Sequence, residues 1–196
     1  PFKKRKLTMA NKDAAFGFRP VKHLSGGEIR NNTYRITTNY DTALYQGQMV
    51  TRVTAGTIET VAAAAIFLGI FNGCQYTDPT TGKPTWAKYY PADVNASDIE
   101  AYVFDDPYIV FEGQHDGTGT EAMNFGGFDL AGVSGSTKTG RSTQEIGTST
   151  LATTGQWKQI GISKDPSNSD TSTANVNAYV VPSQDLHFFL QAATLA

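Results

Sequence analysis

The chain has little of what reactive proteins use. Its 196 residues include one cysteine and three histidines, and charged residues make up only 17%, against about 25% in an average soluble domain. The single cysteine, Cys74, excludes an internal disulfide and a metal site built from several cysteines. No cationic residue adjoins Cys74 in the sequence, so we interpret it as a half-buried strand residue rather than a reactive thiol.

Long hydrophobic runs are also missing. The longest apolar stretch, 61–71, has roughly 11 residues, whereas a membrane-spanning helix needs about 20. The basic residues 3–6 are not followed by an apolar run of the length that a secretion signal requires. We therefore predict that the chain has no membrane partner.

The charge balance argues against nucleic acid as a partner. The formal net charge is −2, so no overall basic field attracts phosphates. The basic residues 3–6 lack the interleaved aromatic side chains on which bases stack. Met9 followed by Ala10, Asn11 and Lys12 is typical of a protein start, which predicts that residues 1–8 are an upstream extension.

What the chain does have is the composition of a β protein. Threonine, which suits a half-buried pleated surface, is abundant, and glycine, asparagine and serine supply turns. Short runs with β propensity recur at intervals of about 8–15 residues, the spacing of a barrel or sandwich. These runs lie at 33–36, 48–53, 57–61, 66–71, 73–76, 86–90, 99–104, 108–112, 123–130, 157–162 and 176–181. We predict an all-β fold with little helix, in which residues 33–182 form a single compact β-barrel or β-sandwich body.

The two ends of the chain differ from this body. Residues 1–32 show no sustained helical or strand period and are interrupted by proline and glycine, which predicts an extended N-terminal arm. Phe16, Phe18 and Val21 lie in this arm, which cannot bury them against itself, so they must pack on the body or on a neighbouring protein. Residues 183–196 are predicted to be a tail that forms a short helix or docks as a second arm.

No segment has the spacing of a catalytic motif. Two glycine-rich segments resemble a hydrolase turn, but the one at 23–27 does not open with glycine and the one at 132–136 does not close with it. The stretch 132–139 lacks the ending of a phosphate-binding loop, because no glycine precedes Lys138. The acidic residues offer no spacing that singles out a glycosidase pair. We predict no enzymatic activity, no catalytic residue and no cofactor.

One acidic cluster is the best candidate for a metal site. Asp105, Asp106, Glu112, His115 and Asp116 lie close together in the sequence, and oxygen ligands suit a hard cation such as Ca²⁺. The spacing is not that of an EF-hand, and aspartates often cap turns. We therefore favour turn capping and predict no metal ligands.

Aromatic residues gather around a predicted hairpin. Tyr76, Trp86, Tyr89 and Tyr90 flank the turn cluster 78–84. Such a set forms either an exposed platform for a glycan or receptor, or part of the core, and core packing is the interpretation that we favour.

Several landmarks together resemble a family of tailed-bacteriophage head proteins, the capsid decoration or cement proteins. The resemblance covers residues 14 to about 182, and its most specific parts are a Gly-Phe-Arg-Pro-Val opening and an Asp-Asp-Pro segment. The landmarks are Ala15-Phe16-Gly17-Phe18-Arg19-Pro20-Val21-Lys22-His23, the segments 24–27, 42–50 and 68–71, Tyr90-Pro91-Ala92, the segment 101–112 with Asp105-Asp106-Pro107, and the segments 139–142, 157–162 and 175–181.

The resemblance implies a structural virion protein that is made in the host cytoplasm and bound to the exterior of an icosahedral capsid. Its implied partners are the major capsid protein and further copies of itself, in a homotrimer or another symmetric oligomer. In the arm, we expect Phe16, Phe18 and Val21 to anchor on the capsid, Arg19 to bind a carboxylate there, and Pro20 to stiffen the segment. The alternatives are another virion component, such as a tail or fibre-associated protein, and a glycan- or receptor-binding β module.

Overall fold

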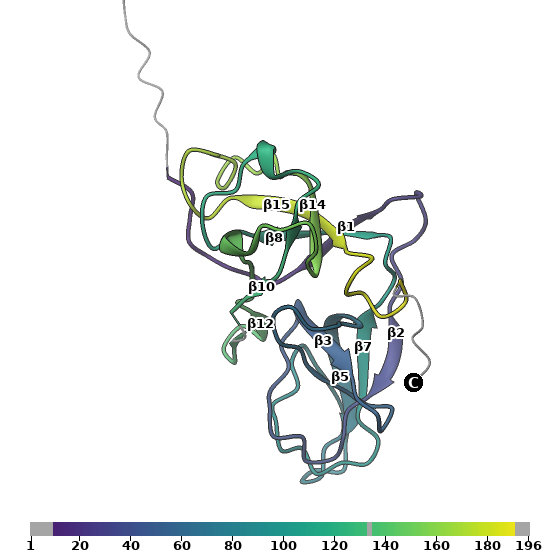
Figure 1. Ribbon diagram of the computed structural model, residues 1–196. Helices are drawn as coiled ribbons and strands as arrows, with labels where there is room; N and C mark the ends of the chain where they lie inside the picture. The colour runs from purple at the N-terminus through teal and green to yellow at the C-terminus, as the bar shows by residue number, and fades with distance from the viewer. Residues whose placement is uncertain (1–9, 133–134, 191–196) are drawn as a thin grey trace, which may run out of the picture.

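The computed structural model describes residues 10–132 and 135–190, in which nearly all regular structure is β (Figure 1). The helices in these ranges are two short 3-10 turns, η1 (Glu121–Met123) and η2 (Thr148–Thr150), and neither could cross a membrane. The strands are β1 (Arg19–His23), β2 (Asn32–Arg35), β3 (Gln48–Arg52), β4 (Ile58–Thr60), β5 (Gly69–Thr77), β6 (Pro84–Ala87), β7 (Glu100–Phe104), β8 (Ile109–Gln114), β9 (Gly127–Phe128), β10 (Leu130–Ala131), β11 (Gly135–Ser136), β12 (Arg141–Ser142), β13 (Glu145–Ile146), β14 (Trp157–Ile162) and β15 (Asn177–Pro182).

The strands form two antiparallel sheets. A five-stranded sheet has the order β1-β8-β15-β14-β9, and a six-stranded sheet has the order β2-β7-β5-β3-β4, with β6 paired to β5. The first sheet occupies the upper half of Figure 1 and the second the lower half. Two small ribbons, β10–β13 and β11–β12, complete the fold. The predicted all-β body is confirmed as a sandwich-like packing of sheets, without a closed barrel.

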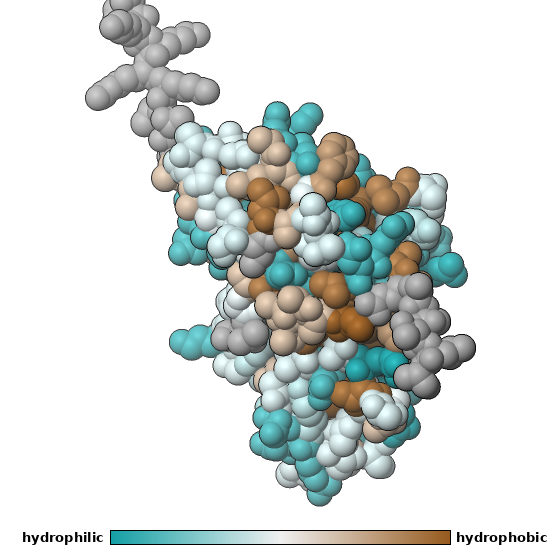
Figure 2. All heavy atoms as spheres, in the orientation of Figure 1, coloured by the Kyte–Doolittle hydropathy of each residue, from teal (hydrophilic) through white to brown (hydrophobic). Residues whose placement is uncertain are grey.

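The two sheets share their core. One cluster of buried side chains surrounds Trp157 of β14 and includes Met49 and Ile70 from the six-stranded sheet. The indole N–H of Trp157 donates to the sulfur of Met49, with 3.1 Å between the two atoms. A second cluster, around Phe71 and Tyr90, joins residues of the six-stranded sheet to residues of its connecting segments. The face shown in Figure 2 is mostly polar, with separate apolar patches in the upper half, at the junction of the halves and in the lower half.

The strand pattern explains which residues face inward. In β7 the buried residues are Ala101 and Val103, at alternate positions, as expected of a strand with one covered face. All six residues of β8 are buried, because β8 is flanked by β1 and β15 and packs into the core. The segment 105–108 between β7 and β8 carries the chain from one sheet to the other.

Two expectations about local structure need correction. The weak strand predicted over 123–130 is the end of η1 followed by β9 and the start of β10. The buried strand expected to begin at residue 66 begins at Gly69 instead, after a turn in the alanine-rich segment. The predicted hairpin is confirmed: β5 and β6 pair around a turn in which Asp78 Oδ1 accepts from the backbone N–H groups of Thr80 and Thr81.

The C-terminal tail docks on the body over its described part. Phe67 donates its backbone N–H to the carbonyl of Leu186 and accepts from the N–H of Phe188, each at 2.9 Å. Residues 183–190 form turns and an isolated bridge rather than an α-helix. The expectations for residues 1–9 and 191–196, including the basic residues 3–6, concern positions outside the described residues.

The docked tail buries a histidine. The ring of His187 packs edge-on against Phe67, with 5.0 Å between the ring centroids. Burial lowers the pKa of His187 from 6.5 to about 4, although nearby Asp105 and Asp106 act in the opposite direction. His115 is buried as well, and desolvation lowers its pKa despite the hydrogen bond to Gln159. The native state therefore holds both imidazoles neutral near neutral pH.

This burial predicts a loss of stability in mild acid. Unfolded His187 takes up a proton as the pH falls through 6.5, whereas the folded residue does so only near 4. The stability that depends on neutral His187 is thus complete above pH 6.5 and declines as the pH falls toward 4. We expect a loss of about 2 kcal/mol from this residue between about pH 7 and about pH 5. Denaturant unfolding at the two pH values should show a smaller loss in His187→Gln, and an unchanged loss would contradict the assignment.

Candidate functional site

The N-terminal segment is bound along the body rather than held away from it. The side chain of Asn11 donates to the carbonyls of Asp170 and Ala174, at 2.8 and 2.9 Å. The carbonyl of Lys12 accepts from the side-chain amides of Gln114 and Asn168, at 3.0 and 2.8 Å. These contacts correct the prediction of an arm that ends at residue 32, because the segment belongs to the body from its first described residues.

The segment then becomes the edge strand of the five-stranded sheet. β1 pairs with β8 in an antiparallel register that aligns Arg19 with Glu112, and a bulge interrupts the pairing at Val21. Proline and a bulge are devices that protect a sheet edge from pairing with other chains. Val21, at the bulge, is 42% exposed.

A pair of glycines allows the segment to pass close to the second sheet. Gly17 has a φ of +74°, and a side chain there would meet the carbonyl oxygen of Gly47 at 2.5 Å. Gly47 also has a positive φ and faces the backbone of Phe16 and Phe18. The backbone N–H of Phe18 donates to the carbonyl of Gly47 at 2.8 Å. Glycine is therefore required at position 17 both for conformation and for space.

Phe18 belongs to the core. Its side chain is 1% exposed and stacks on Trp157, with ring centroids 4.5 Å apart. The expectation that Phe18 anchors on another protein is therefore wrong, since its ring has no surface left for a partner. The sequence left open whether these apolar residues pack on their own body or on a neighbouring protein. Phe18 packs on its own body.

The carboxylate that pairs with Arg19 also belongs to this chain. Its guanidinium forms an ion pair with Glu112, whose side chain is almost fully buried. The hydroxyl of Ser163 donates to the other carboxylate oxygen of Glu112 at 2.6 Å. A buried carboxylate needs such partners, so Arg19 contributes to stability in this structure. The guanidinium also lies over the ring of Phe16, with 4.8 Å from its carbon to the ring centroid.

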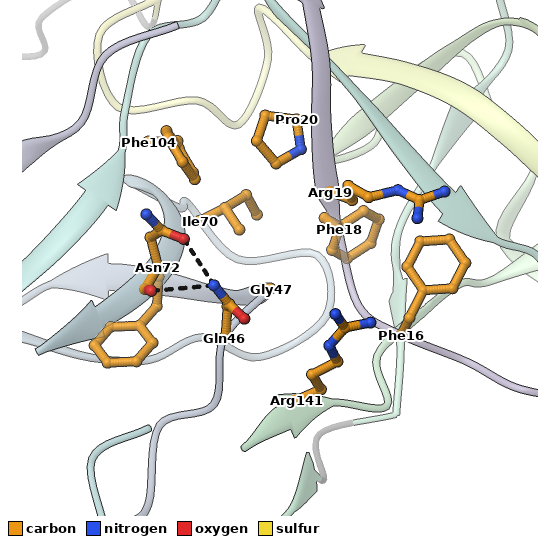
Figure 3. A pocket seen from close by; sticks show the side chains of 11 residues that line it. Phe16, Phe18, Arg19, Pro20, Gln46, Gly47, Ile70, Asn72, Phe104 and Arg141 are labelled. Atoms are coloured by element: carbon orange, nitrogen blue, oxygen red, sulfur yellow. Dashed lines mark hydrogen bonds between the residues drawn. The ribbon is translucent and has the colours of Figure 1, made fainter. Parts of the chain in front are cut away.

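These residues surround a small pocket, which we call the N-terminal pocket (Figure 3). Its volume is about 160 Å³, and it lies between the N-terminal segment and the six-stranded sheet. Gln46 points across it and donates to the side-chain oxygen of Asn72 at 3.0 Å. Phe16, Phe18, Arg19 and Pro20 line it together with Gln46, Gly47, Ile70, Phe71, Asn72, Phe104 and Arg141.

The lining of this pocket suits the binding of an apolar group next to a negative charge. Its floor and walls are largely apolar, and Arg141 is exposed at its rim, without a carboxylate partner among the described residues. Pockets for small-molecule ligands usually measure about 300–1,000 Å³. The N-terminal pocket is smaller and suits a single side chain of a protein, preferably one next to a carboxylate that Arg141 would attract.

The acidic cluster from the sequence does not form one site. Asp105 accepts hydrogen bonds from Asn32 and Tyr34, and Asp106 contacts His23 at 3.0 Å. His115 follows β8, whereas Asp105 precedes it. The ring of His115 forms hydrogen bonds with Gln159 and Thr148. In the ranges 10–132 and 135–190, no group of three or more His, Cys, Asp and Glu residues is arranged to hold a metal ion.

The structure also shows which of Cys74 and the aromatic residues near the hairpin are buried and which are exposed. Cys74 is buried in β5, and desolvation raises the pKa of its thiol to about 12, which keeps it protonated and unreactive. Tyr90 is fully buried, and Tyr89 stacks on Tyr45. Trp86 of β6 is the exception, because its side chain is 69% exposed.

Sequence reasoning missed the half of the pocket that comes from other parts of the chain. Gln46, Ile70, Phe104 and Arg141 lie far from the N-terminal segment in the sequence, and nothing in their local patterns links them to it. No family model, curated protein or solved structure matches this chain. The assignment of a function therefore depends on the geometry and on the sequence landmarks.

Removal of the Phe18 ring tests whether the segment is part of the core. We expect Phe18→Ala to lower the free energy of unfolding by about 3–5 kcal/mol, because it leaves a cavity beside Trp157. Phe125→Ala is the matched control, since Phe125 is 80% exposed, and it should change stability by less than about 0.5 kcal/mol. Equal stabilities of the two variants in urea would show that the segment is not packed as described.

Proposed function

We propose that this chain is a structural protein of a bacteriophage virion, which binds the outer surface of an icosahedral capsid and stabilises the contacts between major capsid subunits. In this proposal it acts as a homotrimer or another symmetric oligomer. It needs no cofactor and catalyses no reaction.

The N-terminal pocket is the observation that carries the proposal. Three residues of the most specific sequence landmark, Phe16, Arg19 and Pro20, line this pocket, and the buried ring of Phe18 forms part of its wall. A preformed pocket bordered by this landmark supports the proposal of a protein whose task is to hold another protein. A capsid segment with an apolar side chain beside a carboxylate has the chemistry that this pocket and Arg141 would accept.

Exposed apolar side chains also lie along β1 and beyond its C-terminal end. Leu24 follows β1, and its backbone N–H donates to the carbonyl of Tyr108 at 2.9 Å, which brings the two residues together. Leu24, Tyr108 and Val21 are all exposed. Exposed aromatic and aliphatic residues of this kind are typical of protein interfaces.

The proposed mechanism is thermodynamic. A protein that binds the assembled shell, and not separate subunits, stabilises the shell by RT ln(1 + [L]/Kd). A symmetric oligomer adds to this, because once one copy is bound the others meet their sites at high effective concentration. A fold whose N-terminal segment is already ordered loses little conformational entropy on binding.

The charge at the pocket rim provides the test. We expect Arg141→Glu to weaken binding to purified capsids that lack this chain by about tenfold or more, because a carboxylate at the rim would repel an acidic partner segment. Binding is measured by co-sedimentation of the purified protein with those capsids. Arg141 is exposed, so the variant should fold normally, as circular dichroism can verify.

Lys83→Glu makes the same charge change in the exposed turn between β5 and β6 and serves as the matched control. It should bind capsids as the native protein does. If the native protein fails to sediment with capsids, or if it binds tails or fibres instead, the proposal of a capsid partner is wrong. If both variants bind as tightly as the native protein, the pocket is not the contact surface.

A further inference from the structure

A second surface lies on the six-stranded sheet next to the N-terminal pocket, and Asn72 lines both. Trp86 of β6 and Tyr102 of β7 stack there in nearly parallel planes, with an interplanar angle of 10° and 5.4 Å between the ring centroids. The two strands lie on either side of β5, so the rings meet across it. Trp86 keeps 69% of its surface exposed in this arrangement.

A glycine of β5 lies between the two aromatic strands. Gly73 pairs with Tyr102 and follows a bulge at Asn72. Its φ is +139°, and a side chain there would meet the carbonyl oxygen of Ala87 at 2.9 Å. Glycine at this position thus lets the backbone after Trp86 lie close to β5.

The aromatic pair borders an open groove of about 420 Å³, which we call the Trp86 groove. This volume lies within the range of about 300–1,000 Å³ that is usual for small-ligand sites. Amide and amine groups share the lining with the rings, from Asn31, Asn72 and Lys88. Gln46 donates to Asn72 Oδ1 at 3.0 Å, and Asn72 Nδ2 has no acceptor within the described part of the chain.

We propose that the Trp86 groove binds the pyranose rings of a polysaccharide. A pyranose presents a flat C–H face that packs on an indole ring, and its hydroxyl groups both donate and accept hydrogen bonds around the edge. Aromatic rings with an apolar face supply the first contact. Side-chain amides, which also donate and accept, supply the second, and the Lys88 ammonium adds a donor for a hydroxyl or a ring carboxylate.

The surroundings of Trp86 favour a sugar over the other ligands that stack on aromatic rings. The centre of a protein interface is depleted of charge and surrounds its aromatic residue with apolar contacts, whereas amides and an amine surround Trp86. Single-stranded nucleic acid needs a positively charged groove. Here Lys88 is the one cation in the lining, and Glu100 lies two residues from Tyr102 on β7.

Tryptophan fluorescence gives a direct assay. The chain has two tryptophans, and Trp157 is fully buried, so an added sugar changes the emission through Trp86. The probes are cellohexaose and chitohexaose as neutral pyranose chains, an alginate hexamer as an acidic one, and a printed array of bacterial surface polysaccharides. We expect saturable binding of at least one of these probes by the native protein.

Substitutions then locate the site. We expect Trp86→Ala to weaken binding on the array by about tenfold or more, and Trp86→Phe, which keeps a ring, to weaken it less. Phe125→Ala removes an aromatic ring that is also largely exposed, at 80%, elsewhere on the body and should leave binding unchanged. Lys88→Met should weaken binding of the alginate hexamer alone if the ring carboxylate is recognised, and binding of all probes if a hydroxyl is.

The outcomes separate this proposal from the capsid proposal. If no pyranose probe binds, or if Trp86→Ala binds the array as well as the native protein does, the groove is not a sugar site. If Trp86→Ala loses capsid binding, Trp86 is a protein contact and the sugar proposal is also wrong. Sugar binding with no capsid binding would leave the Trp86 groove assigned and overturn the capsid proposal.

Discussion

The stacking of Phe18 on Trp157 is the contact on which the rest of the structure depends. Trp157 also touches Phe67 and Phe111, so one indole ring joins segments from both ends of the chain and from the middle. Once Phe18 is buried there, the chain before it must cross close to the six-stranded sheet, which only a glycine at position 17 permits. The chain after it must continue as the edge strand β1.

The two proposed surfaces follow from that arrangement and from the pairing of β5, with its bulge at Asn72, to β6 and β7. The N-terminal pocket exists because the segment is held across the second sheet, leaving Phe16 and Pro20 at its border. The Trp86 groove lies where β6 and β7 flank β5 and bring the rings of Trp86 and Tyr102 together. Both surfaces are formed by backbone geometry in a folded body, which suits binding without rearrangement.

Much of the fold could be predicted from the sequence, and much of the site could not. Alternation of residue types was enough to locate β7 and β14, because one face of each strand is covered. An apolar segment such as the one around Phe18 has the same composition whether it packs on its own body or on a neighbour. The sequence therefore could not decide between the two, nor could it bring Arg141 to the same pocket. The aromatic cluster posed the same problem. Tyr90 and Trp86 are both aromatic residues beside the same predicted turn, yet Tyr90 is buried and Trp86 is exposed.

The central claim is that this body works by contact with the outside of a capsid. Electron cryo-microscopy of intact particles that contain the chain tests it most directly. The account predicts density for the two sheets on the exterior of the shell, with the N-terminal pocket against a major capsid subunit and the Trp86 groove facing the solvent. Density that lies inside the shell, or in the tail alone, would contradict the account.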